Sequence, residues 1–187
     1  DVCSSDLCAK YLADFNIDVT LFDKGKFLRT ILPTGGGRCN LAHAEFDFKE
    51  LAKNYPRGEK FLYSVFSKFS TQNTIDYFES IGVETYVQDD NRIFPASNSS
   101  VDVREKFLKS MDKVKLVKEN IIAIEKLEHS YKLTSEKSTY SFDIVVVAIG
   151  GHSSYELLKQ NNINIIEPTQ SLVGLETKKD YSNISGV

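Results

Sequence analysis

The stretch Ile17-Asp18-Val19-Thr20-Leu21-Phe22-Asp23 alternates and then turns apolar, as does a strand that enters a buried sheet and ends at an acid. The preceding residues, Cys8 to Phe15, have the pattern of the end of a helix. A second run, Ile144-Val145-Val146-Val147-Ala148-Ile149, is continuously apolar, as in parallel strands covered on both faces, and Gly150-Gly151 follow it. Two such strands predict an α/β fold with a central parallel sheet.

The residues between these two strands predict helices and a small antiparallel meander. Apolar residues recur at helical spacing from Asp47 to Ser80, and a further helix is expected from Val101 to Asp112, behind a possible cap at Ser99. Two short strands are expected over the ranges 83–87 and 92–95. Four later strand-like pieces, separated by polar turns, make up the meander and cover the ranges 114–117, 121–127, 131–134 and 139–142. A last short helix is expected over Tyr155 to Gln160.

Asp23 is the first candidate for a ligand-binding residue. In a dinucleotide-binding βαβ unit, the second strand ends in an acid that accepts hydrogen bonds from a ribose, about 20 residues after a glycine-rich turn. Counting back from Asp23 reaches Cys3-Ser4-Ser5, which contains no glycine. The simpler interpretation, a solvated acid at the end of a strand, therefore stays open.

The densest glycine cluster of the sequence, Gly35-Gly36-Gly37-Arg38-Cys39-Asn40, is the second candidate. A backbone without Cβ atoms can approach a planar ring or a phosphate, and a neighbouring guanidinium adds charge-assisted hydrogen bonds to an anion. The alternative is a flexible surface loop. Cys39 has no second cysteine nearby, so we expect a small packed side chain rather than a redox dithiol.

The composition limits the class of protein. The chain has 187 residues, and a formal net charge of −3 argues against binding to nucleic acid or to anionic membranes. No apolar run is long enough to span a bilayer, and three cysteines without a C-x-x-C pair favour a soluble protein of the reducing cytoplasm. His43, His129 and His152 are scattered, so no metal site is expected. Neither a Walker loop nor a G-x-S-x-G elbow is present.

At Gly35-Gly36-Gly37-Arg38-Cys39-Asn40 the sequence resembles the bacterial NAD(P)/FAD-dependent oxidoreductase family of aminoacetone-oxidase-like flavoproteins. The resemblance, in the family's order, also rests on Leu21-Phe22-Asp23-Lys24, Arg29, Gly82-Val83-Glu84-Thr85 and Arg92-Ile93-Phe94-Pro95-Ala96-Ser97. It covers the chain from about Leu7 to Val173. It implies a Rossmann-like FAD/NAD(P)-binding domain, with a central parallel sheet, helices and the antiparallel meander as the crossover element.

The resemblance also implies a flavoprotein oxidoreductase with non-covalent FAD, NAD(P)H as a candidate electron donor and a small-molecule substrate. Hydride transfer through a flavin needs no strong protein acid or base, which agrees with the absence of an obvious catalytic dyad. The implied cofactor contacts are Asp23 and Lys24 at the adenosine ribose, Arg29 and Arg38 near the phosphates or the ring, Gly35, Gly36, Gly37, Cys39 and Asn40 along the isoalloxazine, the backbone of Ile121 or Ile122 at the adenine, and Gly150 and Gly151 against the cofactor.

By the same resemblance, residues 1–168 form a partial FAD-binding domain without its first strand and glycine-rich turn, and residues 169–187 begin an inserted β-rich substrate domain. Residues 1–6 do not follow the family's pattern, and Leu41-Ala42-His43 stands where the family has a hydroxyl residue and an asparagine. We expect an active full-length parent and an inactive fragment. The alternatives are a non-catalytic nucleotide- or protein-binding module of the same fold, and a disulfide reductase, which the lack of paired cysteines disfavours.

Overall fold

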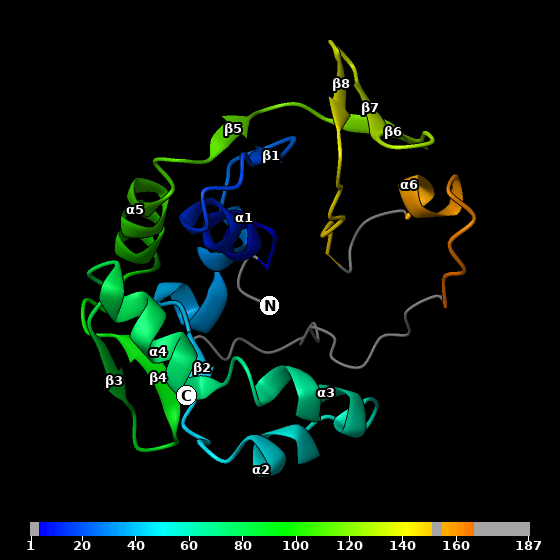
Figure 1. Cartoon of the computed structure of the whole chain (residues 1–187). Helices are drawn as coiled ribbons and strands as arrows, with labels where there is room; N and C mark the ends of the chain where they lie inside the picture. The colour runs from blue at the N-terminus through cyan, green and yellow to red at the C-terminus, as the bar shows by residue number, and fades with distance from the viewer. Residues whose placement is uncertain (1–3, 151–154, 167–187) are drawn as a thin grey trace, which may run out of the picture. The chain divides into compact units, whose positions relative to one another are not determined.

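The structure is a computed structural model that describes residues 4–150 and 155–166 (Figure 1). Its described residues divide into two compact units. The first unit contains residues 4–21 and 25–116, and the second contains residues 22–24, 117–150 and 155–166. The strands β1 and β5 each contain residues that are assigned to both units.

The first unit is mainly helical. Helices α1 (Ser4–Asp14), α4 (Thr71–Ser80) and α5 (Ser100–Ser110) supply much of its core. On α5, Val103 and Phe107 are fully buried, and the Phe107 ring meets Phe78 edge-on at a centroid distance of 6.1 Å. The predicted cap is confirmed, because Ser99 Oγ accepts a hydrogen bond of 3.3 Å from the Asp102 N–H. α5 therefore begins where the sequence indicated.

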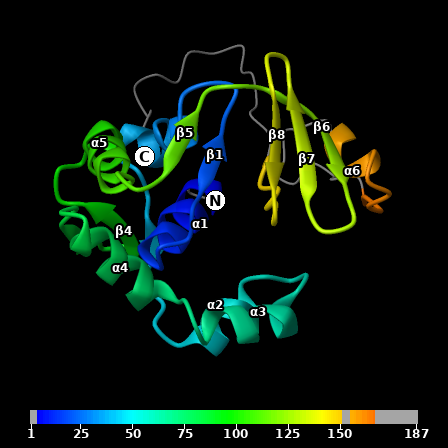
Figure 2. The same cartoon turned by 45° about the horizontal axis from the view of Figure 1, so that its top comes forward.

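The helical pattern from Asp47 to Ser80 is divided among the three helices α2, α3 and α4 (Figure 2). α2 (Phe48–Lys53) and α3 (Glu59–Phe66) pack on each other as a hairpin, and α4 follows. The first break contains Pro56, which has no N–H to donate, and Gly58, whose φ of +102° lies outside the right-handed helical region. At the second break, Ser70 and Asn73 form a capping box that starts α4.

A three-stranded antiparallel sheet in the first unit has the order β2-β4-β3. β3 (Thr85–Val87) and β4 (Arg92–Pro95) agree with the predicted short strands, whereas β2 (Ala42–His43) was not predicted. The register pairs Ala42 with Ile93 and Tyr86 with Phe94. Ile93 and Phe94 are both completely buried in the central strand.

The parallel pair consists of β1 (Thr20–Phe22) and β5 (Lys115–Val117). Lys115 N donates to Val19 O at 2.9 Å and Asp23 N donates to Val117 O at 3.2 Å. The residue numbers of both strands rise together along this ladder, which makes the strands parallel. The α/β class is thereby confirmed. The sequence pattern predicts that residues 114–117 belong to the meander, and their pairing with β1 corrects that assignment.

The second unit contains the predicted antiparallel meander, β6 (Ile121–Lys126), β7 (Tyr131–Ser135) and β8 (Thr139–Phe142), in sequential order. Phe22 packs against β8, with ring centroids 4.9 Å from Tyr140 and 5.9 Å from Phe142. Helix α6 (Glu156–Lys159) lies at the position of the last predicted helix, and Asn161 Nδ2 donates to Ile124 O at 2.9 Å.

The prediction of a buried strand at residues 144–149 is wrong for this structure. The run belongs to no sheet of the described chain, and Ile144 and Val146 are 80% and 62% exposed. A strand covered on both faces needs hydrogen-bonded neighbours as well as an apolar composition, and within residues 4–150 and 155–166 no strand pairs with this run. The predictions for residues 169–187 lie outside the described residues.

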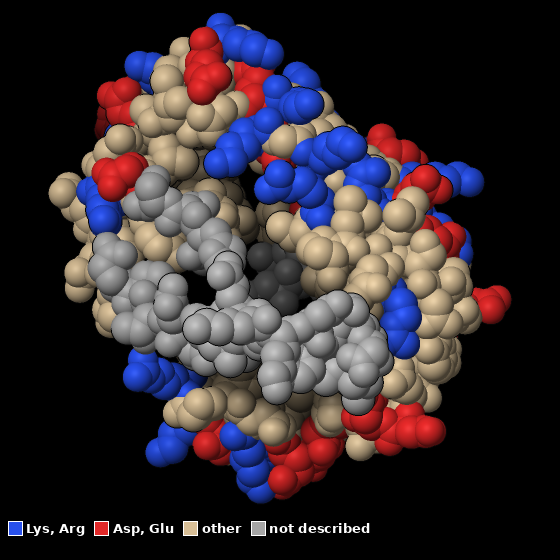
Figure 3. Space-filling view, turned by 180° about the vertical axis from the view of Figure 1, so that it is seen from behind, with Lys and Arg blue, Asp and Glu red and all other residues tan. Residues whose placement is uncertain are grey.

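No helix within the described ranges is long and apolar enough to cross a membrane. Figure 3 shows that basic and acidic side chains are both exposed on the drawn surface. The visible face is therefore not covered by a single sign of charge.

Candidate functional site

The glycine cluster of the first unit lies in the second of two short 3₁₀ turns and in the segment that follows it. η1 (Arg29–Ile31) packs beside η2 (Thr34–Gly37), and Cys39 N donates to Thr34 O at 3.0 Å to close the second turn. Gly35 and Gly36 have φ values of +57° and +66°, a left-handed conformation that glycine adopts at little cost. This region is a hydrogen-bonded turn in the structure.

The two sides of this turn differ in the space they leave. A Cβ added to Gly35 would lie 2.7 Å from Asn40 N and 2.7 Å from Phe94 Cε1, so this glycine permits close packing inside the protein. A Cβ added to Gly36 or Gly37 would meet no atom within 4 Å. The backbone at Gly36 and Gly37 is therefore open to a flat ligand, which fits the expected approach of an isoalloxazine ring.

Arg38 braces the same turn. Its Nε donates to Gly35 O at 3.3 Å, its Nη1 donates to Gln88 Oε1 at 3.1 Å, and its guanidinium carbon lies 4.0 Å from the centroid of the Phe94 ring. Stacking of a guanidinium on an aromatic face adds a cation–π attraction to the two hydrogen bonds. These two bonds use two of the five N–H donors of the side chain, which leaves three for an anion.

Cys39 and Asn40 complete the turn in different ways. Cys39 is completely buried in the core, and burial raises the pKa of its thiol, partly offset by a hydrogen bond with Thr34. The expectation of a packed small side chain agrees with this position. The Oδ1 atom of Asn40 is buried and accepts no hydrogen bond from the described residues. An unsatisfied buried acceptor is costly, so this atom would be stabilised by a donor on a ligand or on water.

Helix α5 fixes the segment that leads into the turn. Ser100 Oγ donates to Leu32 O at 2.8 Å, and Arg104 Nε donates to Phe27 O at 3.0 Å. Ile31 is fully buried, whereas the side chain of Arg29 is exposed beside the glycine turn. Sequence reasoning missed Gln88, Ser100 and Arg104, because their partners lie 50 or more residues away along the chain.

The remaining candidates belong to the second unit. Asp23 and Lys24 are exposed at the end of β1, and the Asp23 N–H is held by Val117 O. Ile122 is an irregularity in the β6–β7 register, which pairs Ile121 with Ser135 and then Ala123 with Thr134. A bulged residue has no opposite residue in the ladder, and this geometry fits the expected backbone contact to an adenine. Gly150 is exposed with a φ of +74°, and Gly151 lies outside the described residues.

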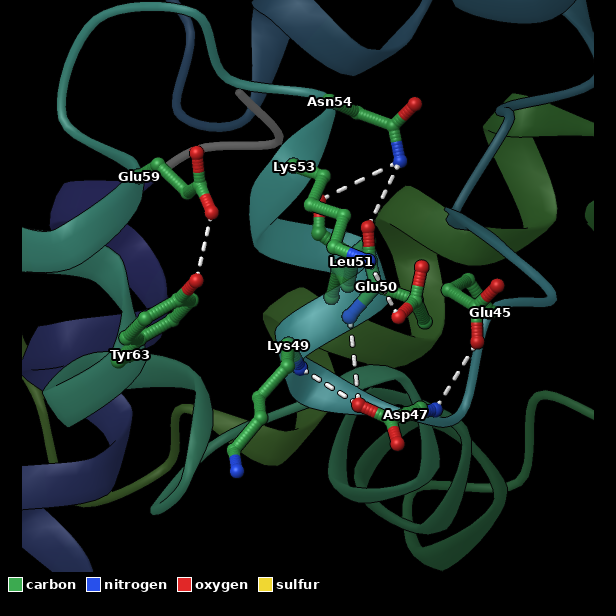
Figure 4. A network of polar contacts seen from close by, with 9 residues as sticks. All are labelled: Glu45, Asp47, Lys49, Glu50, Leu51, Lys53, Asn54, Glu59 and Tyr63. Atoms are coloured by element: carbon green, nitrogen blue, oxygen red, sulfur yellow. Dashed lines mark hydrogen bonds and ion pairs between the residues drawn. The ribbon is translucent and has the colours of Figure 1, made fainter.

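The acidic and basic side chains of the α2–α3 hairpin form a self-contained polar network (Figure 4). Asp47 Oδ1 accepts hydrogen bonds from Lys49 N at 2.7 Å and Glu50 N at 3.2 Å, and these bonds lower the pKa of the Asp47 carboxyl. Lys53 Nζ lies 2.6 Å from Glu50 Oε1. The network stabilises helix ends. In the part of the chain that the structure describes, no group of three or more His, Cys, Asp or Glu side chains could hold a metal ion.

Comparison with known proteins extends these observations. The family model described as "HI0933-like protein Rossmann domain" matches residues 4–179. The ribosomal RNA dihydrouridine synthase of Haemophilus influenzae is 25% identical over 200 aligned positions, which include 96% of this chain and 49% of that protein. The 3-dehydro-bile acid delta(4,6)-reductase of Clostridium scindens is 26% identical over 172 positions, with 85% and 41% covered. The chain thus spans less than half the length of either relative.

Proposed function

Because this chain belongs to the HI0933-like Rossmann-domain family, we propose that it is part of a FAD-dependent oxidoreductase that transfers hydride through non-covalently bound FAD. The single observation that carries the proposal is the glycine turn, whose backbone is open at Gly36 and Gly37 and which is followed at Asn40 by an unsatisfied buried acceptor. Both relatives have the names of enzymes, and one of them is a reductase.

Each proposed contact of the first unit follows from the chemistry of a described group. The backbone of Gly36 and Gly37 would lie along the ring of the cofactor, and Asn40 Oδ1 would accept a hydrogen bond from it. Arg38 would hold the turn in place and direct its remaining donors, with those of Arg29, toward negative charge. Cys39 would act by packing under the turn rather than by chemistry of its thiol.

The second unit would contact the adenosine end. We propose that Asp23 accepts hydrogen bonds from the ribose, that Lys24 lies nearby, and that the backbone at Ile121 or Ile122 meets the adenine. Gly150 and Gly151 would let the cofactor approach the backbone. When bound, FAD supplies the hydride chemistry, and the protein orients it and tunes it with nearby charge.

The donor and substrate belong to the proposal as well. We propose NAD(P)H as the electron donor. We also propose a small molecule as the substrate, because a formal net charge of −3 is unfavourable for binding a polyanion. An RNA substrate, as in the name of the Haemophilus influenzae relative, is the competing possibility, and retention of a ribosomal RNA fragment in a mobility-shift assay would favour it. The free thiols of Cys8 and Cys39 support a reducing, cytoplasmic location.

Titration of FAD fluorescence with the purified chain tests the cofactor. We expect weak but saturable binding, because the sequence contains no Gly-x-Gly-x-x-Gly turn to hold the pyrophosphate. Asp23→Ala should weaken binding, whereas Asp18→Ala, which removes another exposed carboxylate near the start of the same strand, should not. Absence of FAD binding, or equal effects of the two substitutions, would contradict the proposal. NAD(P)H oxidation by the full-length protein separates an enzyme from a non-catalytic binding module.

A further inference from the structure

The segment that carries the glycine turn begins and ends at a residue with an unfavourable backbone conformation. Leu28 has a φ of +58° and Cys39 has a φ of +67°, both in the left-handed region. For a residue with a side chain, this conformation costs a factor of about 5 to 30 in the local equilibrium. The other described non-glycine residues of this unit with a positive φ are all asparagines, which tolerate the left-handed region. The segment 28–39 is therefore held in an arrangement that its own backbone does not favour.

The side chains of Leu28 and Cys39 are buried in the hydrophobic core of the first unit. Both belong to the same cluster of buried residues as Ile31. Burial of these side chains offsets the cost of the two left-handed residues, because removal of apolar surface from water is favourable. The opposite side of the segment has no such packing, since Gly36 and Gly37 lie next to open space. The turn thus depends on contacts from outside the segment to keep its shape.

Helix α5 supplies such contacts on both sides of η1. Ser100 Oγ donates to Leu32 O at 2.8 Å, and Arg104 Nε donates to Phe27 O at 3.0 Å. Because Ser100 and Arg104 are four residues apart, they lie on one face of the helix. The same helix packs against η2. The two acceptors lie before Leu28 and directly after η1, so the two donors fix both ends of the strained first turn.

The strength of these two contacts can be compared with the cost of the strained backbone. A hydrogen bond from a charged donor, as at Arg104, typically shifts an equilibrium by about tenfold to a hundredfold, and one from a hydroxyl group, as at Ser100, by about threefold to tenfold. Together they are large enough to offset the strain at one end of the segment. Loss of either contact should therefore let the turn open more often.

We propose that Ser100 and Arg104 are positioning residues for the cofactor, which hold the strained segment 28–39 in the arrangement that leaves the backbone of Gly36 and Gly37 open to a ligand. Neither side chain needs to touch that ligand. A ligand that binds one arrangement loses affinity in proportion to the fraction of molecules that leave it, so α5 controls affinity through the closed fraction of the turn. The effect on FAD rests on the proposed function, whereas the effect on the turn does not.

Amide hydrogen exchange of the ¹⁵N-labelled chain without FAD measures the opening of the turn. Two amides report it, because the Leu32 N–H closes η1 and the Cys39 N–H closes η2. The reference is the N–H of Val83, a buried residue of the same unit, which donates to Phe78 O at 2.9 Å. Opening of the whole unit exposes all three amides, whereas opening of the turn alone exposes only the first two.

Arg104→Met removes the guanidinium and keeps most of the aliphatic stem. Exchange at Leu32 and Cys39 should become about tenfold to a hundredfold faster, while Val83 is unchanged. Ser100→Ala should accelerate the same two amides by about threefold to tenfold. Lys109→Met, which removes an exposed cation from the same helix, is the matched control and should change none of them.

Three results would overturn the proposal. Equal acceleration at Val83 would mean that the α5 contacts stabilise the whole unit. Acceleration confined to Leu32 would mean that they do not reach the glycine turn. Unchanged exchange at both Leu32 and Cys39 would mean that the contacts do not hold the segment at all.

Titration of FAD into the double variant Ser100→Ala/Arg104→Met tests the positioning role. Its loss of FAD affinity should equal the loss of closed fraction that hydrogen exchange reports. Affinity that falls while the turn stays closed, or that stays unchanged while the turn is mostly open, would refute this role. A chain that binds no FAD in any form would refute the flavoprotein function, and the exchange rates would still decide whether α5 holds the turn.

Discussion

Alanine substitutions at Gly35 and Gly36 should have different main effects. Gly35→Ala should mainly lower the stability of the fold, and Gly36→Ala should mainly weaken FAD binding. Gly35 and Gly36 both have left-handed φ values, so alanine at either position costs about 1 to 2 kcal/mol of folding free energy. At Gly35 the new Cβ also lies 2.7 Å from the backbone N of Asn40, and overpacking of this kind adds about 1 to 3 kcal/mol. Gly35→Ala should therefore cost about 2 to 5 kcal/mol, and Gly36→Ala about 1 to 2 kcal/mol.

Urea denaturation and the rate of thiol labelling at the buried Cys39 measure the loss of stability next to the turn. Titration of FAD fluorescence measures the affinity for FAD. Gly36→Ala should keep Cys39 protected and yet weaken FAD binding, because its methyl group enters the space proposed for the ring. In Gly35→Ala, Cys39 should be labelled faster than in Gly36→Ala. If both variants lose the same stability, or if Gly36→Ala binds FAD as well as the unmodified chain, the assignment of one packed side and one open side is wrong.

Three further substitutions test individual side chains. Arg38→Ala should weaken FAD binding or lower the flavin potential of the full-length protein, because charge-assisted hydrogen bonds contribute about 1.5 to 3 kcal/mol. Arg38→Lys should restore only part of this effect. Unchanged affinity and potential would mean that Arg38 only supports the turn through its contact with Phe94. Cys39→Ser should keep FAD and most NAD(P)H oxidation, and loss of turnover with full flavin would show that the thiol takes part in the reaction. Burial raises the pKa of the Tyr77 hydroxyl, so the folded state holds this proton more tightly than the unfolded state. Its contribution to stability is complete below about pH 10 and declines as pH rises, and Tyr77→Phe should flatten this alkaline decline in urea titrations.

The elements that the sequence predicted well are those set by local patterns. α5 follows from its apolar spacing and from the Ser99 cap, and the meander follows from turns between short β-prone segments. β5 was misassigned because its partner, β1, lies 95 residues earlier, and hydrogen bonding over such a separation leaves no local signal. The run at 144–149 has the composition of a buried strand, but burial depends on neighbours that composition does not specify.

The glycine turn shows the same limit at the site. Three consecutive glycines indicated a special backbone, but the sequence did not separate the glycine that packs from those that face open space. That difference depends on Phe94, which lies on a distant strand and contacts both Gly35 and Arg38. The sequence could not predict that Asn40 Oδ1 lacks a hydrogen-bond donor, because the partners of a buried polar atom depend on the folded structure around it.

The run at residues 144–149, in which Ile144 and Val146 are the most exposed side chains, also affects how the isolated chain behaves at high concentration. Six consecutive apolar residues, five of them β-branched, contain neither a charge nor a proline, which is the composition of segments that stack into cross-β fibrils. With Ile144 and Val146 facing solvent, the run can template strand pairing between copies. Self-association of the chain should therefore rise steeply with concentration, and a lysine at Val146 should act as a gatekeeper that keeps the copies apart.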